Sequence, residues 1–138
     1  MVRRSAPLLV AAFAVAGLAA VGWSAAAARS TDPVIVIRFS HFGPSAVTVQ
    51  AGAAVTFVLR NEDPIDHEWI VGDEATHQRH RTGTEPVHAQ RPTEVTIPAL
   101  ETRSTTVTFT TPGRYRYICH LPGHEAYGMV GTLRVVQD

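Results

Sequence analysis

Hydrophobic and polar residues alternate along most of the chain from residue 33 onward, as they do in strands with one buried face. Val55, Phe57 and Leu59, for example, would share the buried face of one strand, because side chains two residues apart lie on the same side. Runs of this kind are separated by turn residues such as Gly, Pro, Asn and Asp. They predict strands at residues 34–39, 47–49, 55–59, 67–71, 95–97, 105–109, 115–119 and 133–135.

About eight short strands, with turns at short intervals and no convincing helix, predict an all-β domain of the sandwich or barrel type. Residues 41–45 contain a Gly-Pro pair and are read as a turn. Residues 72–92 form a long polar loop, and loops of that length are usually functional or disordered. His77, His80 and His88 in this loop permit a second metal site, although a charged loop is more often simply solvated.

The N-terminal residues 1–28 differ in composition from the rest of the chain. Arg3 and Arg4 precede an uncharged run, Leu8–Ala28, that consists mostly of Ala, Val, Leu and Gly. This is the layout of a secretory signal peptide, and we expect cleavage near Ala28. An uncleaved membrane anchor is the alternative, because the run is close to the roughly 20 residues that span a bilayer. The sequence therefore predicts an exported domain at residues 33–138, located in the periplasm or elsewhere outside the cytoplasm.

Charge and cysteine content narrow the possible functions. The 138 residues include 12 arginines, no lysine and 12 acidic residues, and no basic stripe suggests a nucleic acid partner. Cys119 is the only cysteine, so the chain cannot form an intramolecular disulfide. A lone thiol in an exported protein needs another explanation, and a metal site would supply one.

The single cysteine belongs to a regularly spaced group of metal donors. His124 follows Cys119 by five residues, and Met129 follows His124 by five more. Thiolate and thioether sulfur favour Cu(I), whereas imidazole binds both Cu(I) and Cu(II). Two histidines, a cysteine and a weak axial methionine make up the blue-copper arrangement, so this stretch would supply three of its four ligands.

The motif C-x4-H-x4-M at Cys119–Met129, with P-G before the histidine and G-M-x-G at the end, resembles the copper loop of the cupredoxins. These are the type 1 blue copper proteins of the plastocyanin/azurin-like superfamily. The spacing is closer to rusticyanin and auracyanin loops than to the shorter loop of plastocyanin. The resemblance extends over about residues 34–136 and implies a Greek-key β-sandwich that holds one type 1 copper.

The fourth ligand has to come from another part of the chain. The family places its first histidine after a strand and turn like Val55–Asp66, which points to His67. The alternation also places His67 on the same side as Trp69, facing the core. The resemblance thus implies the copper ligands His67, Cys119, His124 and Met129. Each of these has a plainer interpretation by itself, as a surface histidine, a small buried thiol or a core methionine.

Other copper centres fit the residues poorly. Multicopper oxidases use a His-Cys-His triplet, but Ile118 precedes Cys119 here and the chain contains no His-x-His pair. A dinuclear CuA centre needs two bridging cysteines, and nitrite reductases need a second copper with ligands from further domains or subunits. His120 would lie on the strand face opposite Cys119, and we interpret it as an ordinary polar residue near the start of the loop.

These observations predict an exported mononuclear type 1 copper protein that is not an enzyme. It would carry single electrons between redox partner proteins in transient contacts. By resemblance, His124 with apolar neighbours such as Leu121 and Tyr127 would be the electron port. The alternative is a protein that sequesters or delivers copper, which the histidines of residues 72–92 favour. We expect a monomer that contacts a membrane only if the N-terminal segment is retained.

Overall fold

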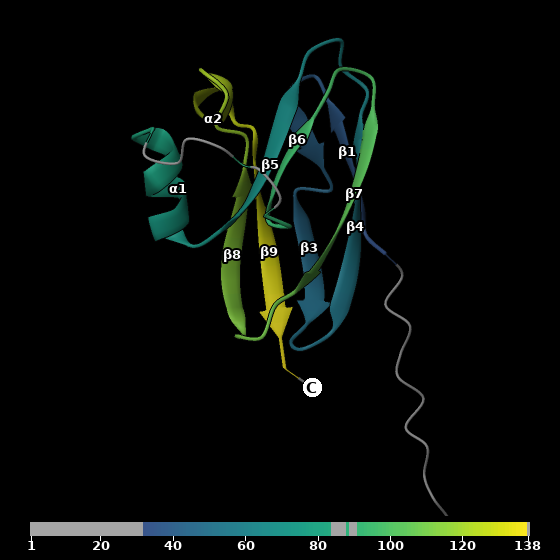
Figure 1. Cartoon of the computed structure of the whole chain (residues 1–138), viewed down its shortest axis with the longest axis vertical. Coiled ribbons are helices and arrows are strands. Elements are labelled where there is room, and N and C mark those ends of the chain that lie inside the picture. The colour runs from purple at the N-terminus through teal and green to yellow at the C-terminus, as the bar shows by residue number, and fades with distance from the viewer. Residues whose placement is uncertain (1–31, 84–87, 89–90, 138) are drawn as a thin grey trace, which may run out of the picture.

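Two β-sheets pack face to face in the computed structural model, which describes residues 32–83, 88 and 91–137 (Figure 1). The predicted signal peptide lies outside these residues. One sheet has the order β2-β1-β4-β7 and contains β1 (Val34–Arg38), β2 (His41–Gly43), β4 (Ala54–Asn61) and β7 (Thr102–Thr108). The other has the order β3-β9-β8-β5-β6 and contains β3 (Ala46–Gln50), β5 (His67–Gly72), β6 (Glu94–Ile97), β8 (Gly113–Ile118) and β9 (Val130–Val136).

The chain passes repeatedly from one sheet to the other, so neighbouring strands come from distant parts of the sequence. β1 pairs in parallel with β4, and β3 pairs in parallel with β9, whereas the remaining pairs are antiparallel. The predicted all-β sandwich is confirmed. Among the described residues, neither helix has the length and hydrophobicity needed to cross a membrane.

The core lies between the sheets and consists of the side chains that the alternation placed inward. Val55, Phe57 and Leu59 of β4 are buried, as predicted, and Phe57 packs against Trp69 of β5 with ring centroids 4.9 Å apart. Tyr117 of β8 extends the same aromatic group, 6.4 Å from Trp69. Because a fully buried large apolar side chain stabilises a fold by about 1.5–3 kcal/mol, these residues hold the two sheets together.

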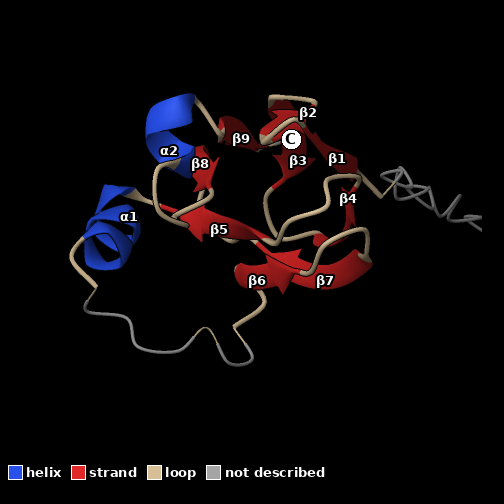
Figure 2. Cartoon of the chain, turned by 90° about the horizontal axis from the view of Figure 1, so that it is seen from above, coloured by secondary structure: helices blue, strands red, loops and turns tan. Residues whose placement is uncertain are grey.

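Three short elements contradict the predicted secondary structure. Residues 41–43, predicted as part of a turn, form β2, whose three residues pair with β1. The absence of helices was also wrong, because α1 (Glu74–Arg81) lies within the polar segment and α2 (His124–Tyr127) within the predicted copper loop. Figure 2 shows α1 beside β5 and α2 beside β8.

Helix α1 forms for reasons of capping and charge, which explains why hydrophobic periodicity failed to predict it. The carboxylate of Asp73 caps the helix by accepting a hydrogen bond from the Thr76 amide at 2.8 Å. Glu74 lies in the first turn and Arg79 and Arg81 lie in the last, where their charges complement the helix dipole. The side chains it buries are those of His77 and His80, neither of them apolar, so the helix has no apolar stripe.

Candidate metal centre

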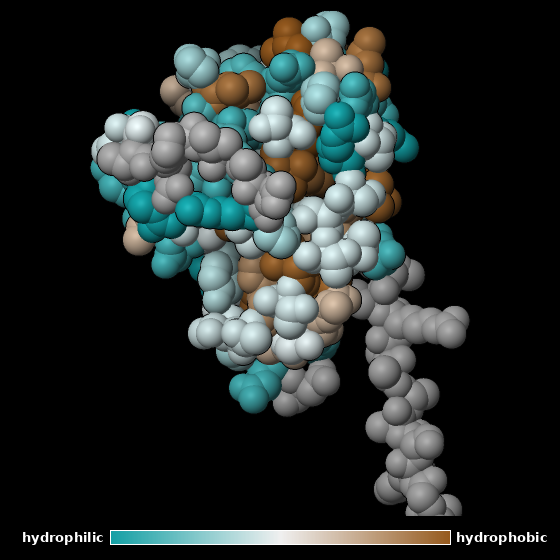
Figure 3. All heavy atoms as spheres, in the orientation of Figure 1, coloured by the Kyte–Doolittle hydropathy of each residue, from teal (hydrophilic) through white to brown (hydrophobic). Residues whose placement is uncertain are grey.

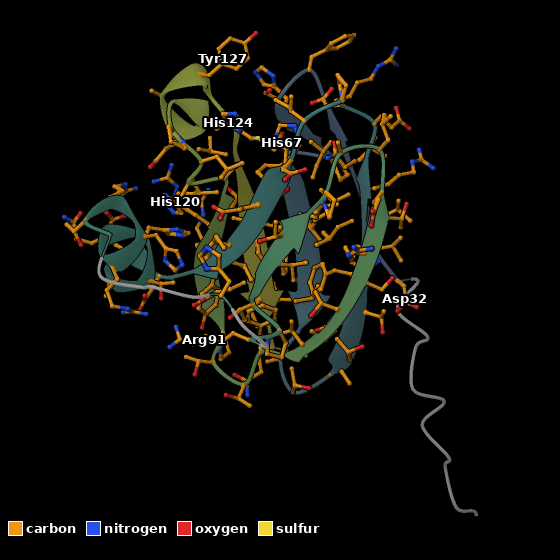
Figure 4. The ribbon with its side chains drawn as sticks, turned by 45° about the horizontal axis from the view of Figure 1, so that its top comes forward. Asp32, His67, Arg91, His120, His124 and Tyr127 are labelled. Atoms are coloured by element: carbon orange, nitrogen blue, oxygen red, sulfur yellow. The ribbon has the colours of Figure 1, made fainter. Side chains whose placement is uncertain are left out.

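Strand pairing brings the four predicted ligands to one end of the five-stranded sheet. β5 begins at His67, and the antiparallel strand β8 ends one residue before Cys119, so both residues lie at the same end. His124 is the first residue of α2, and Met129 directly precedes β9. Figure 4 shows His67 and His124 pointing toward one another at this end.

Three of these side chains aim metal-binding atoms at a common point. The His67 Nδ1 atom lies 3.3 Å from His124 Nδ1, which lies 3.2 Å from Cys119 Sγ. Metal bonds of about 2.0 Å to nitrogen and 2.3 Å to sulfur put two donors on one ion roughly 3–4 Å apart. The imidazole and thiol donors are therefore spaced to hold a single ion, and their chemistry suits copper.

The backbone of the loop fixes Met129 between two of the other predicted ligands. Its amide donates a hydrogen bond to the His124 carbonyl at 3.0 Å, and its carbonyl accepts one from the Cys119 amide at 3.2 Å. Gly123 and Gly128 border α2 with φ angles of 85° and 105°, which L side chains rarely adopt. The methionine side chain is fully buried in the same hydrophobic cluster as Cys119. Axial ligation by its thioether stays a prediction.

Asp63 fixes the orientation of the His67 imidazole. The His67 Nε2–H donates to Asp63 Oδ2 at 2.9 Å, which leaves the lone pair on Nδ1, the atom that faces His124. Burial lowers the pKa of His67, so the imidazole stays neutral, the form that binds a metal. Burial raises the pKa of Asp63, but hydrogen bonds from the Ser40 and Phe39 amides outweigh that effect, and the net shift is downward.

Cys119 is fully buried beside a backbone donor. Burial raises the pKa of its thiol, and the Glu68 amide, which donates to the Sγ atom at 3.4 Å, offsets part of that rise. A bound metal ion would instead lower the pKa of the thiol, because ligation deprotonates a thiol outright.

The sequence did not point to Asp63 or to the Glu68 amide as neighbours of the proposed ligands. The position of Asp63 in a turn four residues before His67 was the available signal.

Comparison with known proteins identifies the family. A family model for copper binding proteins, plastocyanin/azurin family, matches residues 38–136. The chain belongs to this family. Its cofactor is copper, and the predicted relationship to the cupredoxins is confirmed. The role of each of the four side chains as a ligand remains a prediction that the geometry fits.

Two relatives carry the name copper-resistant cuproprotein CopI. The protein from Pseudomonas aeruginosa is 31% identical over an alignment of 144 positions, gaps included, which covers 81% of this chain and 78% of the relative. The protein from Rubrivivax gelatinosus is 33% identical over 115 residues, which cover 80% of this chain and 69% of the relative.

Solved structures of auracyanins share the fold. Auracyanin A from Chloroflexus aurantiacus, described as a blue copper protein, superposes with a TM-score of 0.61 at 28% identity, covering 77% of this chain and 98% of that one. Reduced auracyanin from Roseiflexus castenholzii gives a TM-score of 0.65 at 22% identity, covering 78% and 98% of the two chains.

His120 occupies a different environment from the one predicted. Figure 4 shows His120 on the side of α1, where it contacts His77, whereas the Cys119 side chain contacts His124. His120 is not an ordinary polar loop residue, however, because its side chain is nearly buried and its Nε2 atom lies 3.0 Å from His77 Nδ1. Burial is the main cause that lowers the pKa of His120 to about 4, and the neighbouring His77 lowers it further.

Proposed function

We propose that this protein carries single electrons through a type 1 copper centre, outside the cytoplasm and without being an enzyme. In this proposal His67, Cys119 and His124 bind the copper and Met129 is a weak axial ligand. The convergence of His67 Nδ1, Cys119 Sγ and His124 Nδ1 within 4.8 Å of one another is the observation that carries the proposal. Copper held there supplies a one-electron couple between Cu(I) and Cu(II).

The role of the protein is to keep the donor atoms in place during electron transfer. His67 is held by Asp63, and Cys119 is held by the Glu68 amide and by its backbone bond to Met129. Glu68 belongs to β5, Asp63 lies in the bend between β4 and β5, and Met129 directly precedes β9. The donors would therefore move little when the charge of the centre changes, and buried Cys119 and Met129 keep water away from it.

Exposed apolar side chains at the copper end support a docking surface for redox partners. Phe39, Leu100 and Tyr127 are 71%, 70% and 65% exposed. The turns that carry Phe39 and Leu100 both bond to Asp63, the residue that orients His67. Tyr127 lies on α2, three residues after the half-buried His124, at the outer end of the molecule in Figure 4. Transient redox complexes use small interfaces of this kind.

Visible absorption of the copper-loaded protein tests the ligand assignment. We expect one equivalent of Cu(II) to produce an intense thiolate-to-copper band in the wild type and none in Cys119→Ser. For the electron-carrier role, Tyr127→Ser should keep the band but slow electron exchange with a redox partner protein. A wild-type protein without the band would refute the copper site, whereas exchange unaffected by changes at Phe39, Leu100 and Tyr127 would refute the docking surface.

Copper sequestration or delivery is the second candidate, supported by the name copper-resistant cuproprotein of the two relatives. A carrier keeps its copper through repeated oxidation and reduction, whereas a delivery protein gives Cu(I) to an acceptor. Reduced holo-protein can be incubated with Cu(I) chelators of increasing affinity and then separated from them. Retention of copper together with fast electron exchange supports the carrier, and rapid release supports delivery.

A further inference from the structure

A cluster of histidines lies on the outer side of the five-stranded sheet, on the opposite face from the proposed copper ligands. It contains four of the chain's seven histidines, His77, His80, His88 and His120. The ring of His80, on α1, stacks on the rings of His88 and His120, with centroids 5.1 Å and 5.3 Å apart. The helix α1 thus brings His80 against side chains from two other segments, His88 and His120.

Three donor atoms in this cluster converge on one point. The Glu94 Oε2 atom lies 3.7 Å from His80 Nε2 and 3.5 Å from His88 Nδ1. The side chains of His80 and Glu94 are only 2% and 3% exposed. Within the described part of the chain, none of the three atoms has a hydrogen-bond partner. Buried polar atoms are nearly always paired, so three such atoms facing one another require an explanation.

The remaining nitrogen of each imidazole is already engaged, which directs the lone pairs inward. His80 Nδ1–H donates to the Thr76 carbonyl at 2.9 Å, so Nε2 carries the lone pair. His88 Nε2–H faces the Glu68 carboxylate at 2.9 Å, so Nδ1 carries the lone pair. Histidines that bind metals characteristically donate their other N–H to a carbonyl or a carboxylate.

The carboxylate of Glu94 is arranged in the same way. Its Oε1 atom accepts a hydrogen bond from Arg91 Nη1 at 3.0 Å, and its Oε2 atom faces the two imidazoles. Distances of 3.5 and 3.7 Å are too long for N–H···O hydrogen bonds, which measure about 2.7–3.2 Å. They fit donors that share one ion with bonds of about 2.0–2.2 Å.

We propose that His80, His88 and Glu94 form a second metal site, which binds a divalent transition metal. Two imidazoles and a carboxylate suit Cu(II) and Zn(II), and they disfavour Cu(I) because the set contains no sulfur. Among first-row divalent metals Cu(II) binds such a site most tightly. Three protein ligands also leave a coordination position open for water or another molecule. Figure 3 shows hydrophilic side chains gathered over α1, the helix that carries His80.

The second site adjoins the first through the strand backbone without sharing any side chain with it. Consecutive residues of a strand point to opposite faces, so His67 faces the copper centre while Glu68 holds His88 on the outer side. Cys119 and His120 are divided between the two faces in the same way. The assignment of the copper site and the assignment of the second metal site can therefore be tested independently of one another.

Calorimetric titration of the copper-loaded protein tests the second site. The protein is first given one equivalent of Cu(II), and its thiolate band is recorded. We expect one further equivalent of Zn(II) or Cu(II) to bind, with at least about tenfold weaker affinity in Glu94→Gln. The matched control is Glu101→Gln, which changes an exposed glutamate paired with Arg103 and should bind like the wild type.

A second variant covers the case in which buried Glu94 cannot be replaced without unfolding. The thiolate band reports folding, and if Glu94→Gln loses it, His88→Gln decides, with His41→Gln as its control outside both histidine groups. The proposal is overturned if the wild type binds no further equivalent, or if the site variants bind it as well as their controls do. The same titration in Cys119→Ser keeps this result independent of the first site.

Discussion

Replacing Asp63 with asparagine tests whether that residue orients His67, the proposed copper ligand. The change keeps the shape of the side chain and an oxygen that can accept from the Phe39 amide. It puts an NH₂ group where Oδ2 now accepts hydrogen bonds from the Ser40 amide at 2.8 Å and from His67 Nε2 at 2.9 Å. The NH₂ group would then face the Ser40 N–H and the His67 Nε2–H, so both hydrogen bonds would be lost as long as His67 keeps its proton on Nε2.

The expected magnitude follows from these two hydrogen bonds. A hydrogen bond to a charged group contributes about 1.5–3 kcal/mol to stability. Because the half-buried Ser40 can bond to water instead, we expect the free energy of unfolding of the apo-protein to fall by about 2–4 kcal/mol. His67 would also be free to place its proton on Nδ1. Loss of such an outer partner typically lowers metal affinity about 10–100-fold, or about 1.4–2.8 kcal/mol.

Chemical denaturation of the apo-protein and competition with a Cu(II) chelator measure the two effects separately. Asp66→Asn is the control, because it removes the same charge three residues away. The Asp66 carboxylate accepts a hydrogen bond from the Ala99 amide and does not hold His67. The reasoning is refuted if Asp63→Asn and Asp66→Asn show the same copper affinity within about threefold, whatever their effect on stability.

Two further predictions concern stability away from the copper ligands. Gly131→Ala should destabilise the protein by at least about 1–3 kcal/mol in chemical denaturation, because the added Cβ would overlap the buried Tyr117 ring; an unchanged midpoint would contradict this. Asp73→Ala should cost about 1 kcal/mol by uncapping α1. The hydrogen bond from the Thr76 amide lowers the pKa of Asp73 below its usual 3.8 in the folded protein. The loss of stability on replacing Asp73 should therefore have its full size above pH 3.8, and it should shrink as the pH falls through the pKa of Asp73 in the folded state. Asp73→Asn keeps the cap and should show neither the cost nor its pH dependence.

The sequence was sufficient for the parts of the fold that depend on alternation and for recognising the family from the copper loop. His67 and Cys119 could be placed because a period of two residues fixes which side chains of a strand face inward. The spacing from Cys119 to Met129 then indicated the family. Both inferences depend on residues that are close together in the sequence, and the tertiary structure keeps the local conformation that these patterns predict.

Elements without an apolar pattern could not be predicted in this way. Helix α1 depends on the Asp73 cap and on terminal charges, and β2 consists of three residues held by pairing with β1. The histidine cluster depends on how α1 packs beside the sheet, because His80 and Glu94 are 14 residues apart and touch only in the folded chain. The side on which His120 lies could be predicted, but its neighbours on α1 could not.

The hydrogen bonds around the proposed copper ligands indicate that the donors are already in place before a metal binds. The Cys119 amide bonds to the Met129 carbonyl, the Met129 amide bonds to the His124 carbonyl, and His67 is held by Asp63. None of these contacts uses an atom that would bind copper. A preorganised set of donors loses little conformational freedom when the metal binds, so most of the binding free energy should appear as added stability of the folded state. The same contacts oppose rearrangement of the donors on reduction, as an electron carrier requires.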